Sequence, residues 1–193
     1  MASLGKLGEG GMFRRLLSRF SLYHLMVVAL MAALGIAAKT VVTPLAHMIT
    51  GPLYIPGGAV AGGFYMLFLV LAVSLTGVRG AVGLCGLCQG IMVLALGGAG
   101  SHGALSILTY TLTGLSVDAV MLLMRHRGCC LLCCFLGGVA ANLTGTFVVN
   151  AAFFGLPFVP LMLSLAVAAL SGGMGGTLAW AVTRQLRRHG VIR

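Results

Sequence analysis

Polar side chains recur on two apolar segments of the sequence, at spacings that place them on shared helix faces. In a helix, residues three or four positions apart lie on the same side. One segment carries Ser106, Thr109, Tyr110 and Thr113, and a later one carries Asn142, Thr146 and Asn150. Such groups need partners in lipid, so two interpretations stay open. The stripes either hold helices together or line a ligand pocket, with Asn150, Tyr110 and His102 toward its outer mouth.

Three more polar residues lie within apolar segments, where such groups usually face a cavity or a partner. Lys39 either extends its long side chain to the membrane interface or lines a pocket, where its ammonium group would pair with a carboxylate or phosphate of a ligand. Gln89 is predicted to face either a ligand or a neighbouring helix. Asp118 is expected to have a structural role, through Arg79, Arg125 or polar groups of a neighbouring helix.

The segment 43–58 is too long for a simple turn and too apolar for a soluble loop. It contains His47, Tyr54 and three prolines, but no charged residue. A lid over the outer end of the pocket is consistent with both its length and its apolar character, so we expect the segment to form one. Lids are elements of low local stability. His47 and His102 both fall on the outer side of the expected helices, where they are able to meet.

The six cysteines form two groups, Cys85 with Cys88 and a cluster at 129, 130, 133 and 134. Paired C-x-x-C motifs often bind zinc, but neither group has a histidine or an acidic residue at ligand spacing. We therefore expect buried small residues rather than a metal site, and no structural disulfide at a reducing cytoplasmic edge. Palmitoylation at Cys129 and Cys130 is left open.

The sequence offers little for catalysis. It contains no phosphate-binding G-x-x-x-x-G-K-[ST] motif, so ATP hydrolysis by that route is excluded. Its two acidic residues, Glu9 and Asp118, are far apart in the sequence and form no catalytic pair. No cofactor is expected.

The elements that must position these residues are apolar helices. The chain has 193 residues, of which 60% are hydrophobic and 7% charged, with a mean hydropathy of +1.11. An ordinary soluble domain is about a quarter charged and a disordered chain has low hydrophobicity, so both classes are excluded. A transmembrane helix needs about 20 apolar residues, and candidate spans occur at 20–42, 59–76, 81–96, 104–124, 131–154 and 158–182. The predicted fold is an all-α integral membrane protein, a bundle of six transmembrane helices.

The net charge of +10 follows from topology rather than from nucleic-acid binding, which needs a basic soluble face. Eleven of the twelve basic residues lie before the first span, after the sixth, or in the connections after the second and fourth. Six spans put these positions on one side, which the positive-inside rule assigns to the cytoplasm together with both termini. We expect a flexible tail at 1–19, the transmembrane domain at 20–183 and a basic tail at 184–193. A cleaved signal peptide is the alternative, but removing one span would disturb the charge pattern.

The first span carries small residues at every fourth position, Ala29, Ala33 and Ala37. Small residues at this spacing let another helix approach closely in lipid, although the spacing does not say whether the partner belongs to the same chain. Together with the length, the six spans and the basic ends, this motif resembles the substrate-binding S components of energy-coupling factor (ECF) vitamin transporters.

Further features are similar to one branch of that family, which handles thiamin and its hydroxymethylpyrimidine precursor. They are the segment Gly63-Phe64-Tyr65, the basic turn Arg79-Gly80 and the glycine-rich stretch before the fourth span. The branch alone does not assign the ligand.

The resemblance implies a transport subunit of a bacterial cell membrane rather than an enzyme. It would capture a vitamin-like molecule from outside, in a pocket between helices four to six and beneath the loop that joins helices one and two. The face with Ala29, Ala33 and Ala37 would dock on a transmembrane coupling subunit, which works with two ATPase subunits. The ligand-binding candidates are Lys39, His47, Tyr54, Gln89, His102, Tyr110, Asn142, Thr146 and Asn150.

Two alternatives belong to other functional classes. An intramembrane enzyme acting on lipid or isoprenoid would need clustered acids or metal ligands, and the scarcity of acidic residues argues against it. A structural subunit without its own ligand is the other alternative, and the two polar stripes argue against that.

Overall fold

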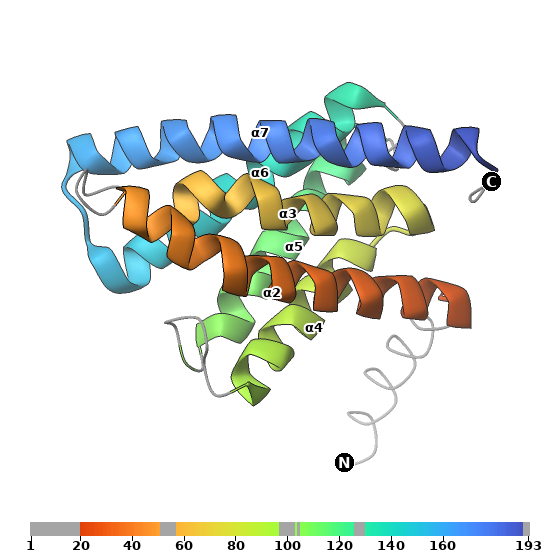
Figure 1. The fold of residues 1–193 in the computed structure, drawn as a ribbon, viewed down its shortest axis with the longest axis horizontal. Helices are drawn as coiled ribbons and strands as arrows, with labels where there is room; N and C mark the ends of the chain where they lie inside the picture. The colour runs from red at the N-terminus through yellow and green to blue at the C-terminus, as the bar shows by residue number, and fades with distance from the viewer. Residues whose placement is uncertain (1–19, 51–56, 97–102, 104, 126–129, 191–193) are drawn as a thin grey trace, which may run out of the picture.

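The computed structural model describes residues 20–50, 57–96, 103, 105–125 and 130–190 (Figure 1). Its elements are α2 (Leu22–Thr50), α3 (Gly57–Thr76), α4 (Ala81–Ala95), α5 (Leu105–Leu123), α6 (Leu131–Val149), the π-helix η2 (Asn150–Phe154) and α7 (Phe158–Arg188). Five helices, counting η2 with α6, are long and apolar enough to cross a bilayer, whereas α4 has 15 residues. The predicted helical membrane fold is confirmed for the described residues, and the tail expected at 1–19 lies outside them.

Two helices run further than the sequence predicted. α2 continues to Thr50 although Pro44 lies inside it. In lipid every backbone group must be bonded internally, so one bond interrupted by proline costs less than an unfolded apolar segment. The lid predicted at 43–58 is therefore wrong for residues 43–50, which belong to α2, and for 57–58, which begin α3. Residues 51–56 lie outside the described residues. α7 likewise extends to Arg188, so the first five residues of the predicted basic tail are helical.

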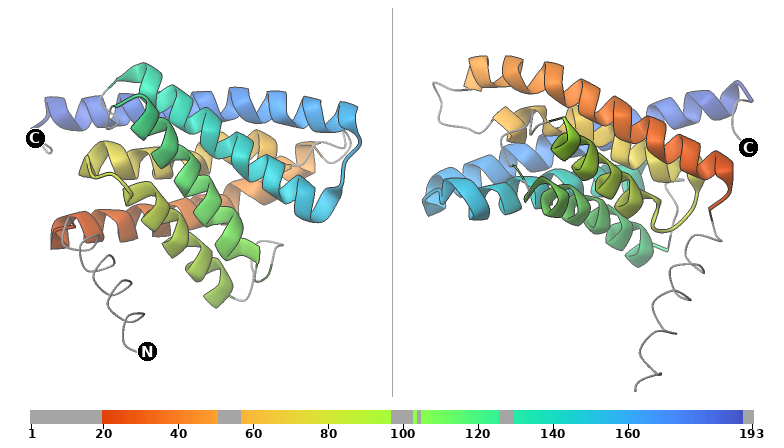
Figure 2. Two further views of the ribbon diagram at one scale, coloured as in Figure 1. Left: turned by 180° about the vertical axis from the view of Figure 1, so that it is seen from behind. Right: turned by 90° about the horizontal axis from the view of Figure 1, so that it is seen from below.

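α3 is the central helix of the bundle (Figure 1). It packs against α2 and α7 and also touches α4 and α6, and most of its residues are buried. α2, α3 and α7 run side by side, whereas α4 and α5 form a pair that crosses them obliquely (Figure 2). Only a narrow stripe of α3 with Val60 and Phe64 is exposed, and a helix that is apolar all round is typical of a core or membrane position.

Glycines allow the backbones of α3, α6 and α7 to approach closely. A Cβ atom on Gly138 of α6 would lie against the backbone of Gly172 and Gly176 of α7, and one on Gly63 of α3 would lie against the backbone of Ser171. At the latter position the Gly63 N–H also donates a hydrogen bond to Ser171 Oγ at 3.0 Å. Close packing of this kind holds helices together in lipid, where the hydrophobic effect does not drive their association.

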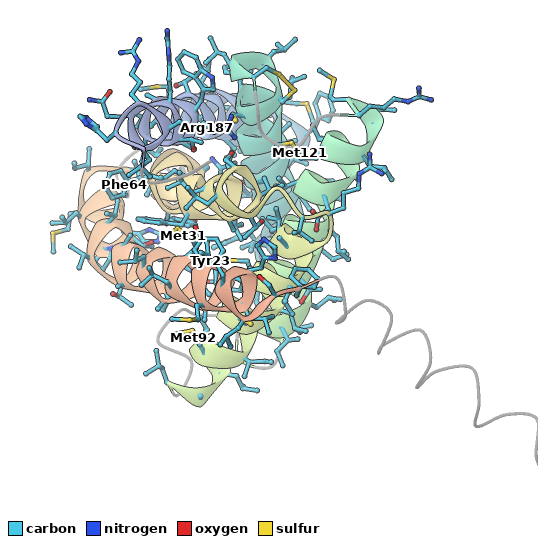
Figure 3. The ribbon with its side chains drawn as sticks, turned by 90° about the vertical axis from the view of Figure 1, so that its right-hand side faces the viewer. Tyr23, Met31, Phe64, Met92, Met121 and Arg187 are labelled. Atoms are coloured by element: carbon cyan, nitrogen blue, oxygen red, sulfur yellow. A yellow bond between two sulfur atoms is a disulfide. The ribbon has the colours of Figure 1, made fainter. Side chains whose placement is uncertain are left out.

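The chain enters and leaves the described bundle at the same end (Figure 1). The α3–α4 connection, the end of α5 and the start of α6 lie at that end too. Figure 3 looks along the bundle from there, with Arg187 on α7 and the buried Met31 and Met121 labelled. The described arginines of these segments are Arg79, Arg125, Arg184, Arg187 and Arg188. The described arginines are thus grouped as six spans require, and their cytoplasmic location stays a prediction.

Candidate ligand-binding site

A cavity lies between α2, α3, α5, α6, η2 and α7, toward the end of the bundle opposite the chain termini. Its water-accessible volume is about 110 Å³, and because one water needs about 10–15 Å³ by this measure, a small organic molecule fits. Six of the nine predicted ligand-binding residues line it: Lys39, His47, Tyr110, Asn142, Thr146 and Asn150. Residues predicted separately on four elements therefore surround one space, and their binding of a ligand stays a prediction.

Lys39 is the one charged residue in the described lining of the cavity. Its Nζ donates a hydrogen bond to Tyr110 Oη at 2.5 Å. The same atom lies 4.8 Å from the centre of the Tyr110 ring and 5.9 Å from that of Tyr65. An ammonium group near an aromatic face is attracted by the negative charge of that face. The Lys39 side chain thus points into the bundle rather than toward the membrane interface. Of the two interpretations of Lys39, this orientation agrees with the one in which it lines a pocket.

Asn142 of α6 joins three helices. It is 1% exposed, and its Nδ2 donates hydrogen bonds to Ala59 O of α3 at 3.0 Å and to Ala168 O of α7 at 2.9 Å. Its Oδ1 lies against Gly62, where a Cβ atom would not fit. Both amide protons are therefore used within the protein. Asn142 holds helices together, as one interpretation of the stripe allowed, and it has no donor left for a ligand.

Asn150 begins the π-helix η2 at the end of α6. Its Oδ1 accepts a hydrogen bond from the Leu156 N–H at 3.0 Å, and its main-chain oxygen accepts one from the Gly155 N–H at 2.8 Å. Gly155 has a φ of 54°, which glycine adopts easily. These bonds fix the turn into α7 and place Phe154 and Leu156 on the cavity. Turns of π-helix often occur at functional sites.

Three of the predicted site residues are not placed on the cavity. Gln89 of α4 is 3% exposed and lies against Gly35 of α2, so it belongs to the contact between these helices. Tyr54 and His102 lie outside the described residues, and the predicted meeting of His102 with His47 stays a prediction. His47 itself lines the cavity from the last turn of α2.

Asp118 of α5 caps the N-terminus of α4, at the end of the bundle away from the cavity. Its Oδ1 accepts a hydrogen bond from the Gly80 N–H at 3.1 Å, and its Oδ2 accepts one from the Gly83 N–H at 2.7 Å. The first N–H groups of a helix have no partner within the helix, and the helix dipole favours a negative charge there. Of the partners left open by the sequence, Asp118 therefore meets polar groups of a neighbouring helix.

Cys130 and Cys133 form a disulfide across the first turn of α6. We expected no structural disulfide here, because a cytoplasmic edge is reducing. The structure differs, because the C-x-x-C spacing at the start of a helix brings the two side chains together. Cys85 is buried and its thiol contacts Val28 O at 3.7 Å. In the part of the chain that the structure describes, no three metal-ligating residues gather at one place.

The alanines of α2 lie on its outward face. Ala29 and Ala37 are exposed and Ala33 is half-buried, whereas the opposite face packs into the bundle. The large apolar neighbours exposed around these alanines are Met26, Leu30, Leu34 and Val41. Within the described chain no helix covers this face.

The profile of a protein family described as "ABC-type cobalt transport system, permease component" matches residues 23–144. The chain belongs to this family. A crystal structure of an S-component of an ECF transporter has the same fold, with a TM-score of 0.75 and 18% sequence identity over 89% of this chain and 88% of that one. No curated protein matches the sequence.

These comparisons confirm the resemblance stated above. As a member of a permease family with the fold of an S component, the chain is a multi-pass membrane protein of a transport system. The branch related to thiamin stays a prediction.

Three polar residues line the cavity without having been predicted as part of a site: Thr43, Tyr65 and Ser164. Thr43 could have been found, because it lies midway between Lys39 and His47 at four-residue spacing. Tyr65 and Ser164 belong to no run of polar residues at three- or four-residue spacing. The Tyr65 hydroxyl donates a hydrogen bond to Gly58 O at 3.3 Å.

Proposed function

We propose that this chain is the substrate-binding S component of an ECF-type importer in a bacterial cell membrane. The observation that carries the proposal is the largely apolar cavity between the helices, whose few polar side chains include Lys39, Tyr110 and Thr146. Small-molecule sites are typically concave, largely apolar and furnished with a few polar groups. The positive-inside rule puts the opposite, arginine-bearing end in the cytoplasm, so the cavity would receive a vitamin-like molecule from outside.

The lining favours an organic molecule over a metal ion, although the family is described by cobalt transport. Transition metals are bound by histidine, cysteine and carboxylate side chains. Among the described lining residues only His47 is of these types, and Lys39 contributes a positive charge that repels cations. We therefore propose a small organic ligand.

We propose the outward face of α2 as the docking surface for a transmembrane coupling subunit. Its support is the exposure of Ala29 and Ala37 with the half-buried Ala33 between them. Helices in lipid pack most closely where small residues line the contact. Two partner ATPase subunits would supply ATP hydrolysis, and no catalytic role is proposed for this chain.

Native mass spectrometry of the full chain, purified from cells, tests the ligand-binding part. We expect the wild type to retain a small molecule and Gly145→Leu to lose it. A Cβ atom at Gly145 would already lie 3.3 Å from Met66 Cε and 3.4 Å from Thr113 Oγ1, so a leucine side chain would fill the cavity. Ala166→Leu, on the exposed face of α7, is the matched control and keeps the bound mass. A wild type without a bound molecule would contradict the proposal.

A further inference from the structure

Among the described residues, no carboxylate pairs with the positive charge of Lys39. The chain has two acidic residues, Glu9 and Asp118. Asp118 is held at the other end of the bundle by the Gly80 and Gly83 N–H groups. Glu9 lies outside the described residues. A cation that is withdrawn from water is costly unless it is paired.

The ammonium group also has hydrogen-bonding capacity to spare. It has three donors, and one is used by Tyr110 Oη. The Tyr110 hydroxyl accepts that bond and still has its own proton to donate. Lys39 and Tyr110 therefore offer donors to the same part of the cavity.

Two buried hydroxyl groups in the cavity lining are without a partner among the described residues. Ser164 Oγ of α7 is one of them, in a residue that is 1% exposed. Thr43 Oγ1 of α2 is the other. Thr43 lies one turn beyond Lys39, so the two side chains share a face of α2. A buried polar group without a partner costs free energy, and a bound molecule that accepts these hydrogen bonds would remove that cost.

We propose that the cavity binds a small organic molecule through an oxyanion group, a carboxylate or a phosphate, held by Lys39. This inference rests on the proposed function and adds the chemical class of the ligand. The oxyanion accepts hydrogen bonds from Lys39 Nζ, from the Tyr110 hydroxyl and from Thr43 Oγ1. Ser164, on α7, bonds to a second polar group of the same molecule.

The same arrangement discriminates against other ligands of similar size. A cationic molecule meets the uncompensated charge of Lys39, and a neutral apolar molecule leaves Thr43 and Ser164 without partners. Burial strengthens the repulsion of a cation, because charges interact more strongly in a medium of low dielectric constant, and it also makes a hydroxyl without a hydrogen bond costly. Selection for an acid therefore follows from the lining alone.

The experiment releases the bound compound by denaturing wild-type protein purified from cells and determines its structure by tandem mass spectrometry. A compound with a carboxylate or phosphate group supports the inference. A neutral or cationic compound overturns the inference and leaves the proposed function standing. If no compound is released, the proposed function itself is contradicted and the inference falls with it.

The released compound then serves as the probe for variants of the full chain. Lys39→Gln is expected to weaken its binding about ten- to a hundred-fold, the range for hydrogen bonds to charged groups. Lys39→Arg keeps the charge and is expected to restore part of the affinity. Ser164→Ala is expected to weaken binding about five-fold. Arg184→Gln, which removes a positive charge stacked on Trp180, is the control and leaves binding unchanged.

A fold control keeps this comparison decisive. The thermal unfolding of each variant is measured without the probe, and Lys39→Arg provides the comparison if Lys39→Gln unfolds. Wild-type affinity in a folded Lys39→Gln, or a loss of affinity in Lys39→Arg as large as that in Lys39→Gln, would overturn the role given to the Lys39 charge.

Discussion

The close packing of α6 on α7 makes neighbouring glycines of α6 respond oppositely to the same substitution. Gly138→Ala adds a Cβ atom that would lie against Gly172 O, 2.9 Å from Gly176 N and 3.0 Å from Gly176 Cα. All three are backbone atoms, which cannot rotate away. Gly137→Ala adds a Cβ atom that meets only side chains, 3.0 Å from Met121 Cε and 3.4 Å from Val117 Cγ1, and the Met121 terminus is flexible.

Two contributions decide how each substitution changes the free energy of unfolding, and the two variants share only one of them. Alanine is favoured over glycine inside a helix by about 1 kcal/mol, and both variants gain this. Overpacking against atoms that cannot yield costs about 1–3 kcal/mol, and only Gly138→Ala incurs it. The free energy of unfolding should therefore be about 1–3 kcal/mol lower for Gly138→Ala than for Gly137→Ala.

The assay is unfolding of each purified variant by titration of a denaturing detergent into mild detergent, followed by circular dichroism. The difference between the two variants removes the shared helix-propensity term and isolates the packing of α6 on α7. Equal unfolding free energies, or a less stable Gly137→Ala, would refute the close approach of Gly138 to Gly172 and Gly176.

Two further predictions concern polar groups that hold helices together. Asn142→Leu removes both hydrogen bonds from Nδ2 and crowds Gly62. Because such a bond contributes about 0.6–1.7 kcal/mol in membranes, we expect the free energy of unfolding to fall by about 1–3 kcal/mol in the same assay. An unchanged unfolding midpoint would count against this prediction. Asp118→Ala removes the cap of α4 and should lower the free energy of unfolding by about 1–2 kcal/mol. Asp118→Asn keeps one acceptor oxygen and should lower it less. Equal decreases for the two variants would contradict this prediction and would show that the charge itself holds the cap.

The helical architecture could be predicted because hydrophobic length alone specifies membrane spans. Helix ends were predicted less well, because α2 continues through Pro44. The rules that end a helix at proline come from water, where a freed carbonyl finds a partner in the solvent. In lipid the backbone has no such partner, so the apolar sequence continues as helix.

The sequence marks candidate site residues in two ways, by polar side chains repeated along one helix and by single polar residues such as Lys39 in apolar segments. The spacing of Asn142, Thr146 and Asn150 placed them on one face, but it did not show that Asn142 spends both amide protons on α3 and α7. Lys39 and Tyr110 lie 71 residues apart, and no pattern along the chain joins them. Contacts between helices depend on crossing geometry, which local spacing does not contain.

One experiment tests the central claim that this chain binds a small molecule and docks through α2. Wild type, Ala33→Trp, Ala29→Trp and the control Ala166→Trp, on the exposed face of α7, are each purified from native membranes, and the intact complexes are weighed by native mass spectrometry. We predict that the wild type and the control carry a coupling subunit, two ATPase subunits and a bound small molecule, and that both α2 variants keep the small molecule but lose the partners. Partners retained by Ala33→Trp and Ala29→Trp, or a wild type that carries neither partner nor ligand, would contradict the account.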